Sequence, residues 1–185
     1  NRGEIVLGGK NSTGLYGVEN TKVFNEATGK ITLNGEAGTA LYFTNDSKVK
    51  LTDESLKNDG VINGTSDSSV GMLYNPGTLA ASVATGNATL VQNNGTISLT
   101  GDKNVGIYAK SDDSNVGYVV ENNKDIVLTG DSTSLSNPNV GIYTTGENNI
   151  IKNNSGSKIQ AGTKAVGIFG YGVESAGDIT VGNKG

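Results

Sequence analysis

Cysteine, histidine and tryptophan are absent from the 185 residues, and proline occurs only twice. Without Cys or His, the chain has no thiol redox chemistry, no disulfide, no Ser-His-Asp or Cys-His catalytic set and no zinc site of thiolates or imidazoles. Two prolines also exclude a collagen-like repeat and a stiff proline-rich linker. We therefore expect no enzyme of these classes.

Positive charge and long apolar runs are scarce as well. Arg2 is the single arginine, and 14 Lys and Arg against 18 Asp and Glu give a formal net charge of −4. A basic patch for nucleic acid is thus not expected. No segment approaches the ~20 consecutive apolar residues of a membrane-spanning helix, and the first residues do not form a signal peptide. We expect no nucleic-acid partner, no membrane insertion by this segment, and a chain cut from something longer.

Glycine and asparagine are abundant, with 28 Gly and 23 Asn, whereas apolar residues make up only 34% of the chain. A compact globule of this length normally has a larger apolar fraction. The sequence is, however, strongly repetitive, and a repeat protein can build a thin core by stacking equivalent positions. Disorder would not require the aliphatic positions to recur in register.

A motif of a small, an aliphatic and an aromatic residue recurs six times, with successive aromatic positions 26 to 35 residues apart. We interpret the third copy as carrying one extra residue. The copies are Gly14-Leu15-Tyr16, Ala40-Leu41-Tyr42, Gly71-Met72-Leu73-Tyr74, Gly106-Ile107-Tyr108, Gly141-Ile142-Tyr143 and Gly167-Ile168-Phe169.

Two further kinds of short run recur along the chain. Runs with Ile or Leu at alternate positions, typical of half-buried strands, lie at 4–7, 30–33, 96–99, 125–128 and 178–181. Apolar runs follow copies of the aromatic motif, at 23–24, 49–51, 90–91, 118–120 and 150–151. No window carries helical periodicity. Three short strands per unit predict an all-β fold: a right-handed parallel β-helix of about six coils, forming one segment over residues 1–185.

The motif Val105-Gly106-Ile107-Tyr108-Ala109, together with the Asn- and Gly-rich run 93–101, resembles the passenger domains of large fusobacterial-type autotransporter (type V) adhesins. The resemblance covers nearly the whole chain, and the nearest types are the arginine-inhibitable coaggregation adhesins and the galactose-sensitive adhesins. It implies a β-helical passenger on the cell surface, anchored to the outer membrane through a C-terminal β-barrel that this chain does not contain.

The resemblance also implies a function. These adhesins mediate coaggregation and host-cell attachment, so the implied partners are surface proteins or glycans of other bacteria or of host cells. Two alternatives stay open. The coils are either a purely structural stalk that holds a distal binding region, or part of a polysaccharide-binding or polysaccharide-cleaving β-helix.

The aromatic positions are the candidate ligand-binding residues. If Ile107 and Ala109 point inward, Tyr108 points outward, because side chains alternate along a strand. Stacked coils would then align six rings on one outer face, where they would stack on sugars or on one another. The opposite orientation, with the rings inside, is the alternative. The predicted set is Tyr16, Tyr42, Tyr74, Tyr108, Tyr143 and Phe169.

Polar residues at the turns have mainly structural interpretations. The pairs Asn58-Asp59, Asn93-Asn94, Asn122-Asn123 and Asn153-Asn154 predict side-chain amide ladders between coils. Asp102 and Asp131 follow Thr-Gly in equivalent turns, and Asp112-Asp113 is the one adjacent Asp pair. No Arg or His accompanies them, so we expect solvated turns, no metal and no cofactor. Insertions at 64–70, 76–88 and 132–139 lengthen individual coils.

Overall fold

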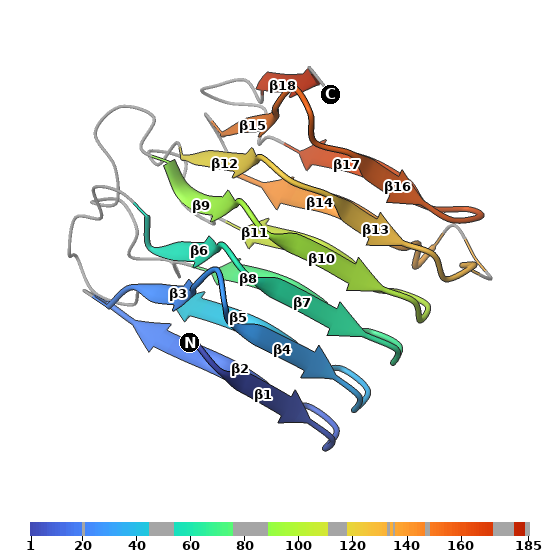
Figure 1. Ribbon diagram of the computed structural model, residues 1–185. Helices are drawn as coiled ribbons and strands as arrows, with labels where there is room; N and C mark the ends of the chain where they lie inside the picture. The colour runs from blue at the N-terminus through green and yellow to red at the C-terminus, as the bar shows by residue number, and fades with distance from the viewer. Residues whose placement is uncertain are drawn as a thin grey trace.

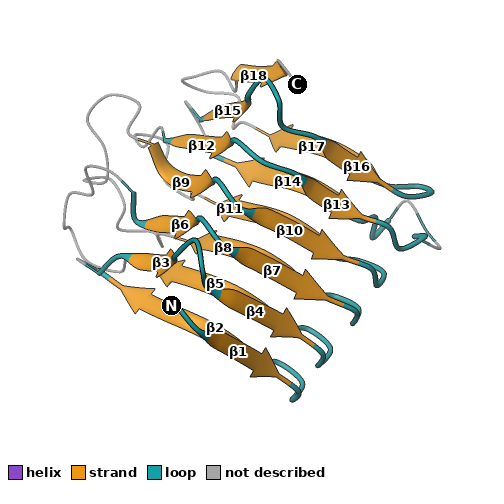
Figure 2. Ribbon diagram, in the orientation of Figure 1, coloured by secondary structure: helices purple, strands orange, loops and turns teal. Residues whose placement is uncertain are grey.

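The fold consists of strands joined by turns. The computed structural model describes residues 1–19, 21–44, 54–75, 89–110, 118–132, 134, 136–146, 149–171 and the backbone of 180–183. Eighteen strands, β1 to β18, run through this part of the chain, which contains no helix (Figure 2). Accordingly, none of these described stretches supplies a helix that is long and apolar enough to cross a membrane.

Every third strand belongs to the same sheet, and all pairings are parallel (Figure 1). Sheet A contains β1 (Glu4–Leu7), β4 (Lys30–Leu33), β7 (Val61–Gly64), β10 (Thr96–Leu99), β13 (Ile126–Leu128) and β16 (Ile159–Ala161). Sheet B contains β2 (Thr13–Val18), β5 (Thr39–Thr44), β8 (Val70–Asn75), β11 (Val105–Lys110), β14 (Val140–Thr145) and β17 (Val166–Tyr171). Sheet C contains β3 (Val23–Asn25), β6 (Leu56–Asn58), β9 (Thr89–Asn93), β12 (Val119–Asn122), β15 (Ile150–Asn153) and β18 (Thr180–Asn183).

Three consecutive strands, one in each sheet, make one coil, and each coil stacks on the preceding one. The predicted all-β parallel solenoid is confirmed. The alternating pattern explains it, because inward aliphatic residues of successive coils fall in register. In sheet A, Ile31 pairs with Ile62 and Ile62 with Ile97, and all three are fully buried. Each such column buries apolar surface only against neighbouring coils, so repetition substitutes for a large core.

The glycine at the second position of β8, β11 and β14 is required by close packing. A Cβ built on Gly106 would lie 2.6 Å from the backbone oxygen of Gly141 and 2.6 Å from Cγ2 of Ile126. Gly71 and Gly141 have equivalent contacts with the next coil and with sheet A. The repeated glycine therefore lets sheets A and B approach each other where the chain turns between them.

A buried amide ladder closes the end of sheet C. Nδ2 of each of the first four members donates to Oδ1 of the Asn in the next coil, at 2.7–2.8 Å. Its members are Asn25, Asn58, Asn93, Asn122 and Asn153. We call them the buried Asn ladder. It confirms the ladder predicted from the Asn pairs and satisfies polar groups that would otherwise be costly inside the solenoid.

Candidate functional site

One column of outward-facing side chains runs along the middle of sheet B. It occupies the fourth position of each six-residue strand, and the register pairs its members coil by coil. In chain order the column is Tyr16, Tyr42, Leu73, Tyr108, Tyr143 and Phe169. We call it the outer aromatic ladder. Within β11, Ile107 and Ala109 are fully buried and Tyr108 is half-buried, as expected for the outward orientation.

The structure corrects one predicted member. Tyr74 is in register with Phe43 and Ala109, not with Tyr42 and Tyr108, and it is fully buried inside the solenoid. Leu73 takes the outward position instead. The third motif therefore carries no extra residue: Gly71-Met72-Leu73 is the regular unit. A shift of one residue along a strand moves a side chain to the opposite face.

Most rings in the outer aromatic ladder stack on one another. The ring centroids of Tyr108 and Tyr143 are 4.9 Å apart with an interplanar angle of 11°. Those of Tyr143 and Phe169 are 4.8 Å apart at 8°. Tyr16 and Tyr42 lie 5.0 Å apart but are tilted by 56°. In the stacked part, ring faces are covered by neighbouring rings, so the surface presents mainly ring edges and phenol hydroxyls.

Exposure of the ladder is greatest at its two ends. Tyr16 is 59% exposed and Phe169 39%, whereas Tyr42, Tyr108 and Tyr143 are half-buried. Tyr171, two residues after Phe169 on the same strand face, is also exposed. The ladder is thus a partly apolar strip along one side of the rod, with polar tips that suit a wet contact surface.

A second set of aromatic residues lies inside the solenoid, and two of its members, Phe43 and Tyr118, were not among the predicted site residues. Tyr74 stacks on Phe43 at 5.6 Å and 7°, and it packs against Tyr118 at 5.1 Å. Burial, and secondarily the neighbouring Tyr118, raises the pKa of Tyr74. Burial also raises the pKa of Tyr118, opposed by a 3.1 Å hydrogen bond with the Thr144 hydroxyl. These phenols are core groups rather than surface ligands.

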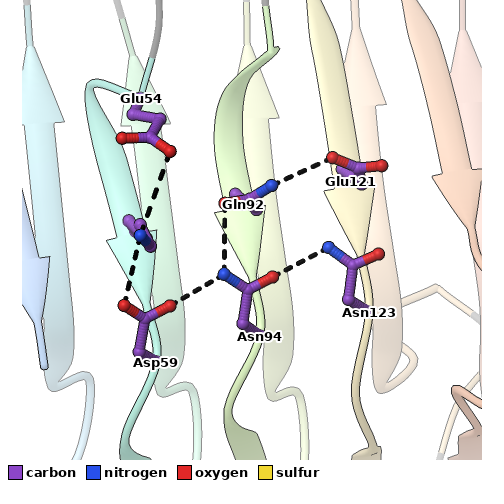
Figure 3. A network of polar contacts seen from close by, with 7 residues as sticks. Glu54, Asp59, Gln92, Asn94, Glu121 and Asn123 are labelled. Carbon is purple, nitrogen blue, oxygen red and sulfur yellow. Dashed lines mark hydrogen bonds and ion pairs between the residues drawn. The ribbon is translucent and has the colours of Figure 1, made fainter. Parts of the chain in front are cut away.

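Sheet C carries a half-exposed polar network beside the buried Asn ladder (Figure 3). Nδ2 of Asn94 donates to Oδ1 of Asp59 at 2.7 Å, and Nδ2 of Asn123 donates to Oδ1 of Asn94 at 2.8 Å. Nε2 of Gln92 donates to a carboxylate oxygen of Glu121 at 3.1 Å. These side chains mainly form hydrogen bonds with side chains of the neighbouring coils. This is the arrangement of a structural ladder.

Asp131 links its turn to the next coil. Oδ1 of Asp131 accepts from the backbone N–H of Thr163 at 3.0 Å, and hydrogen bonds from the hydroxyl and backbone of Thr163 lower the pKa of Asp131. Over the described ranges, no group of three or more acidic side chains is placed to hold a metal ion. Asp112-Asp113 and the insertion 76–88 lie outside the described residues.

Comparisons with protein-family models, with curated proteins and with solved structures find no match for this chain.

Proposed function

We propose that this chain is a passenger segment of a cell-surface adhesin, displayed outside an outer membrane, that contributes to coaggregation or host-cell attachment by non-covalent recognition. The proposal combines the sequence resemblance with one observation: an uninterrupted register of outward positions along sheet B. A parallel solenoid presents such equivalent positions as a long, regular face, which suits contact between two cell surfaces.

A second role within the same adhesin, that of a spacer, is favoured by the stacking of the rings. Tyr143 has its two faces against Tyr108 and Phe169, at interplanar angles of 11° and 8°. Rings used in this way stabilise neighbouring coils and offer few free faces to a ligand. In this role, the coils hold a binding region at a distance from the membrane.

Binding of the purified chain to intact partner bacteria and host cells tests the proposal. Free arginine and galactosides serve as competitors, because the resemblance implies these two classes of inhibitor. A variant carrying Tyr108→Ala and Tyr143→Ala is measured in parallel, with far-UV circular dichroism to verify folding. Saturable binding that one competitor blocks is the expected result. A folded chain that binds neither kind of cell would overturn recognition by these coils and leave the spacer role.

A further inference from the structure

Two tyrosines of the outer aromatic ladder, Tyr16 and Tyr42, lie in direct contact on neighbouring coils. They are register partners on β2 and β5, and their ring centroids are 5.0 Å apart. Aromatic rings in contact have centroids about 4.5–7 Å apart, so this pair lies near the short end of the range. The two residues are 26 positions apart in the sequence. A bond between the rings would therefore join two successive coils.

Exposure distinguishes Tyr16 from the tyrosines of a second pair. Tyr74 and Tyr118 have ring centroids 5.1 Å apart with a tilt of 58°, against 5.0 Å and 56° for the outer pair. The two pairs thus have nearly the same separation and tilt. Tyr16 is 59% exposed, however, whereas Tyr74 and Tyr118 are fully buried. The buried pair is therefore a built-in control for a reaction that starts at the surface.

Oxidation of a phenol requires an exit for its proton as well as for its electron. The exposed Tyr16 can release the proton to water. Among the described residues, the buried hydroxyl of Tyr74 has no hydrogen-bond partner that could accept a proton. An unpaired charge inside the solenoid would also be costly. One-electron oxidation is therefore expected at the outer pair and not at the buried one.

The order of residues in the outer aromatic ladder favours reaction within this pair. Leu73 follows Tyr42 in the ladder and carries no oxidisable ring. Tyr108 comes one coil later, and two strand spacings, about 9.6 Å, separate it from Tyr42. A radical formed on Tyr16 therefore has one ladder tyrosine at contact distance, which is Tyr42.

We propose that Tyr16 and Tyr42 form an oxidative modification site, at which a haem peroxidase with hydrogen peroxide couples the two rings into dityrosine. Each phenol loses one electron and one proton and becomes a tyrosyl radical. The two radicals form a carbon–carbon bond between ring positions ortho to the hydroxyls, and the two ring hydrogens at these positions move to the phenol oxygens. Hydrogen peroxide takes up the two electrons and two protons and becomes two molecules of water. This inference does not depend on the proposed function.

The crosslink would fasten two coils that otherwise hold each other by hydrogen bonds and side-chain packing. It closes a loop between positions 16 and 42, and a covalent loop reduces the conformational entropy of the unfolded chain. We therefore expect the thermal midpoint of the chain to rise after oxidation. The same treatment of Tyr16→Phe should produce no such rise.

The test treats the purified 185-residue chain with a plant haem peroxidase and hydrogen peroxide, and identifies crosslinked tryptic peptides by mass spectrometry. Cleavage after Lys and Arg places each of the seven tyrosines in a different peptide. Tyr16 lies in peptide 11–22 and Tyr42 in peptide 31–48. The expected product is these two peptides joined and lighter by two hydrogen atoms, with the fluorescence of dityrosine. A mixture of unlabelled and isotope-labelled chains shows whether the bond lies within one chain.

Two phenylalanine variants make the test specific. Tyr16→Phe keeps the ring but removes its phenol, so the crosslink between peptides 11–22 and 31–48 should be lost completely. Tyr171→Phe is the matched control, because Tyr171 is 57% exposed and its register partner is Thr145. It should leave the crosslink unchanged. The buried pair should give no crosslink in either variant or in the unmodified chain.

Three results would each overturn the proposal. One is the absence of the crosslink between peptides 11–22 and 31–48 under conditions in which the same reagents couple N-acetyltyrosine amide. The others are an equal yield from the buried pair, and a crosslink found only between differently labelled chains. The assay contains no cells, so its failure leaves the adhesin proposal intact, and failure of cell binding leaves the crosslink intact.

Discussion

Nδ2 of Asn93 donates a hydrogen bond to Oδ1 of Asn122 at 2.7 Å, and both side chains are fully buried between two coils. Asn93 also accepts from Asn58 at 2.8 Å, so one amide links three coils. The neighbouring Asn94 makes the same kind of contacts in the half-exposed network. Two adjacent asparagines therefore permit a direct comparison of buried and solvated ladders.

Replacing Asn93 with Ala should lower the free energy of unfolding by about 2–4 kcal/mol, because it leaves a buried donor on Asn58 and a buried acceptor on Asn122 unpaired. Asn94→Ala, whose partners can turn to water, should cost less than about 1 kcal/mol. Urea denaturation followed by circular dichroism measures both values. Equal losses in the two variants would contradict a special role for the buried Asn ladder.

Alkaline pH should destabilise the rod through its buried tyrosines. The pKa of Tyr118 and that of Tyr74 are raised in the folded chain, mainly by burial. Both phenols are thus neutral when folded but ionise at about pH 10 when unfolded, so unfolding releases protons above that pH. Their stabilising effect is fully present below about pH 10, and stability then falls by about 1.4 kcal/mol per pH unit for each tyrosine.

Urea midpoints between about pH 9 and 12 measure this slope, and tyrosinate absorbance reports when the buried phenols ionise. Tyr118→Phe is the control, since it removes one titrating phenol and should reduce the slope by about half. A slope that Tyr118→Phe leaves unchanged would exclude Tyr118 as a source of the effect.

Replacing the repeated glycine of sheet B with alanine should lower stability by an amount that depends on the coil. Gly106→Ala places a Cβ 2.6 Å from the Gly141 backbone oxygen, which cannot move without displacing a coil, so we expect a loss of about 1–3 kcal/mol. A Cβ on Gly167 meets nothing within 4 Å. Gly167→Ala should therefore change stability by less than about 1 kcal/mol. Thermal unfolding of the two variants checks the difference, and a similar midpoint for both would contradict the close-packing argument.

Much of the fold could be predicted because its units are local and repeated. Alternating Ile and Leu residues define strand faces, and Asn pairs at equivalent places predict stacking amides. The position of Tyr74 could not be obtained from the motif alone, since Met72-Leu73-Tyr74 offers three large side chains in succession. Counting from Gly71, which close packing fixes at the second position of β8, would have placed Leu73 outward.

Contacts between coils were harder to predict where the coils differ in length. Gln92 and Glu121 are 29 residues apart, and the equivalent Lys57 and Gln92 are 35 apart, because the connections between sheets vary. The register therefore becomes visible only when the strands are paired in space. The contact of Tyr118 with Tyr74 could not be predicted for the same reason: the two residues belong to different strands and coils, and the connections between them vary in length.

The outer aromatic ladder gives a last prediction, which separates stabilisation from recognition. Tyr143 stacks closely on Tyr108 and Phe169, and each aromatic pair is worth about 0.5–1.5 kcal/mol beyond simple burial. Tyr143→Ala should thus lower the free energy of unfolding by about 2–3 kcal/mol, whereas Tyr16→Ala, at an exposed end with one tilted partner, should cost about 1 kcal/mol or less. Urea denaturation gives the stabilities, and cell binding is measured at a temperature where both variants remain folded. If Tyr143→Ala loses stability but keeps cell binding, the stacked rings act as structural supports; if it loses binding while remaining folded, the edges of these rings contact the partner.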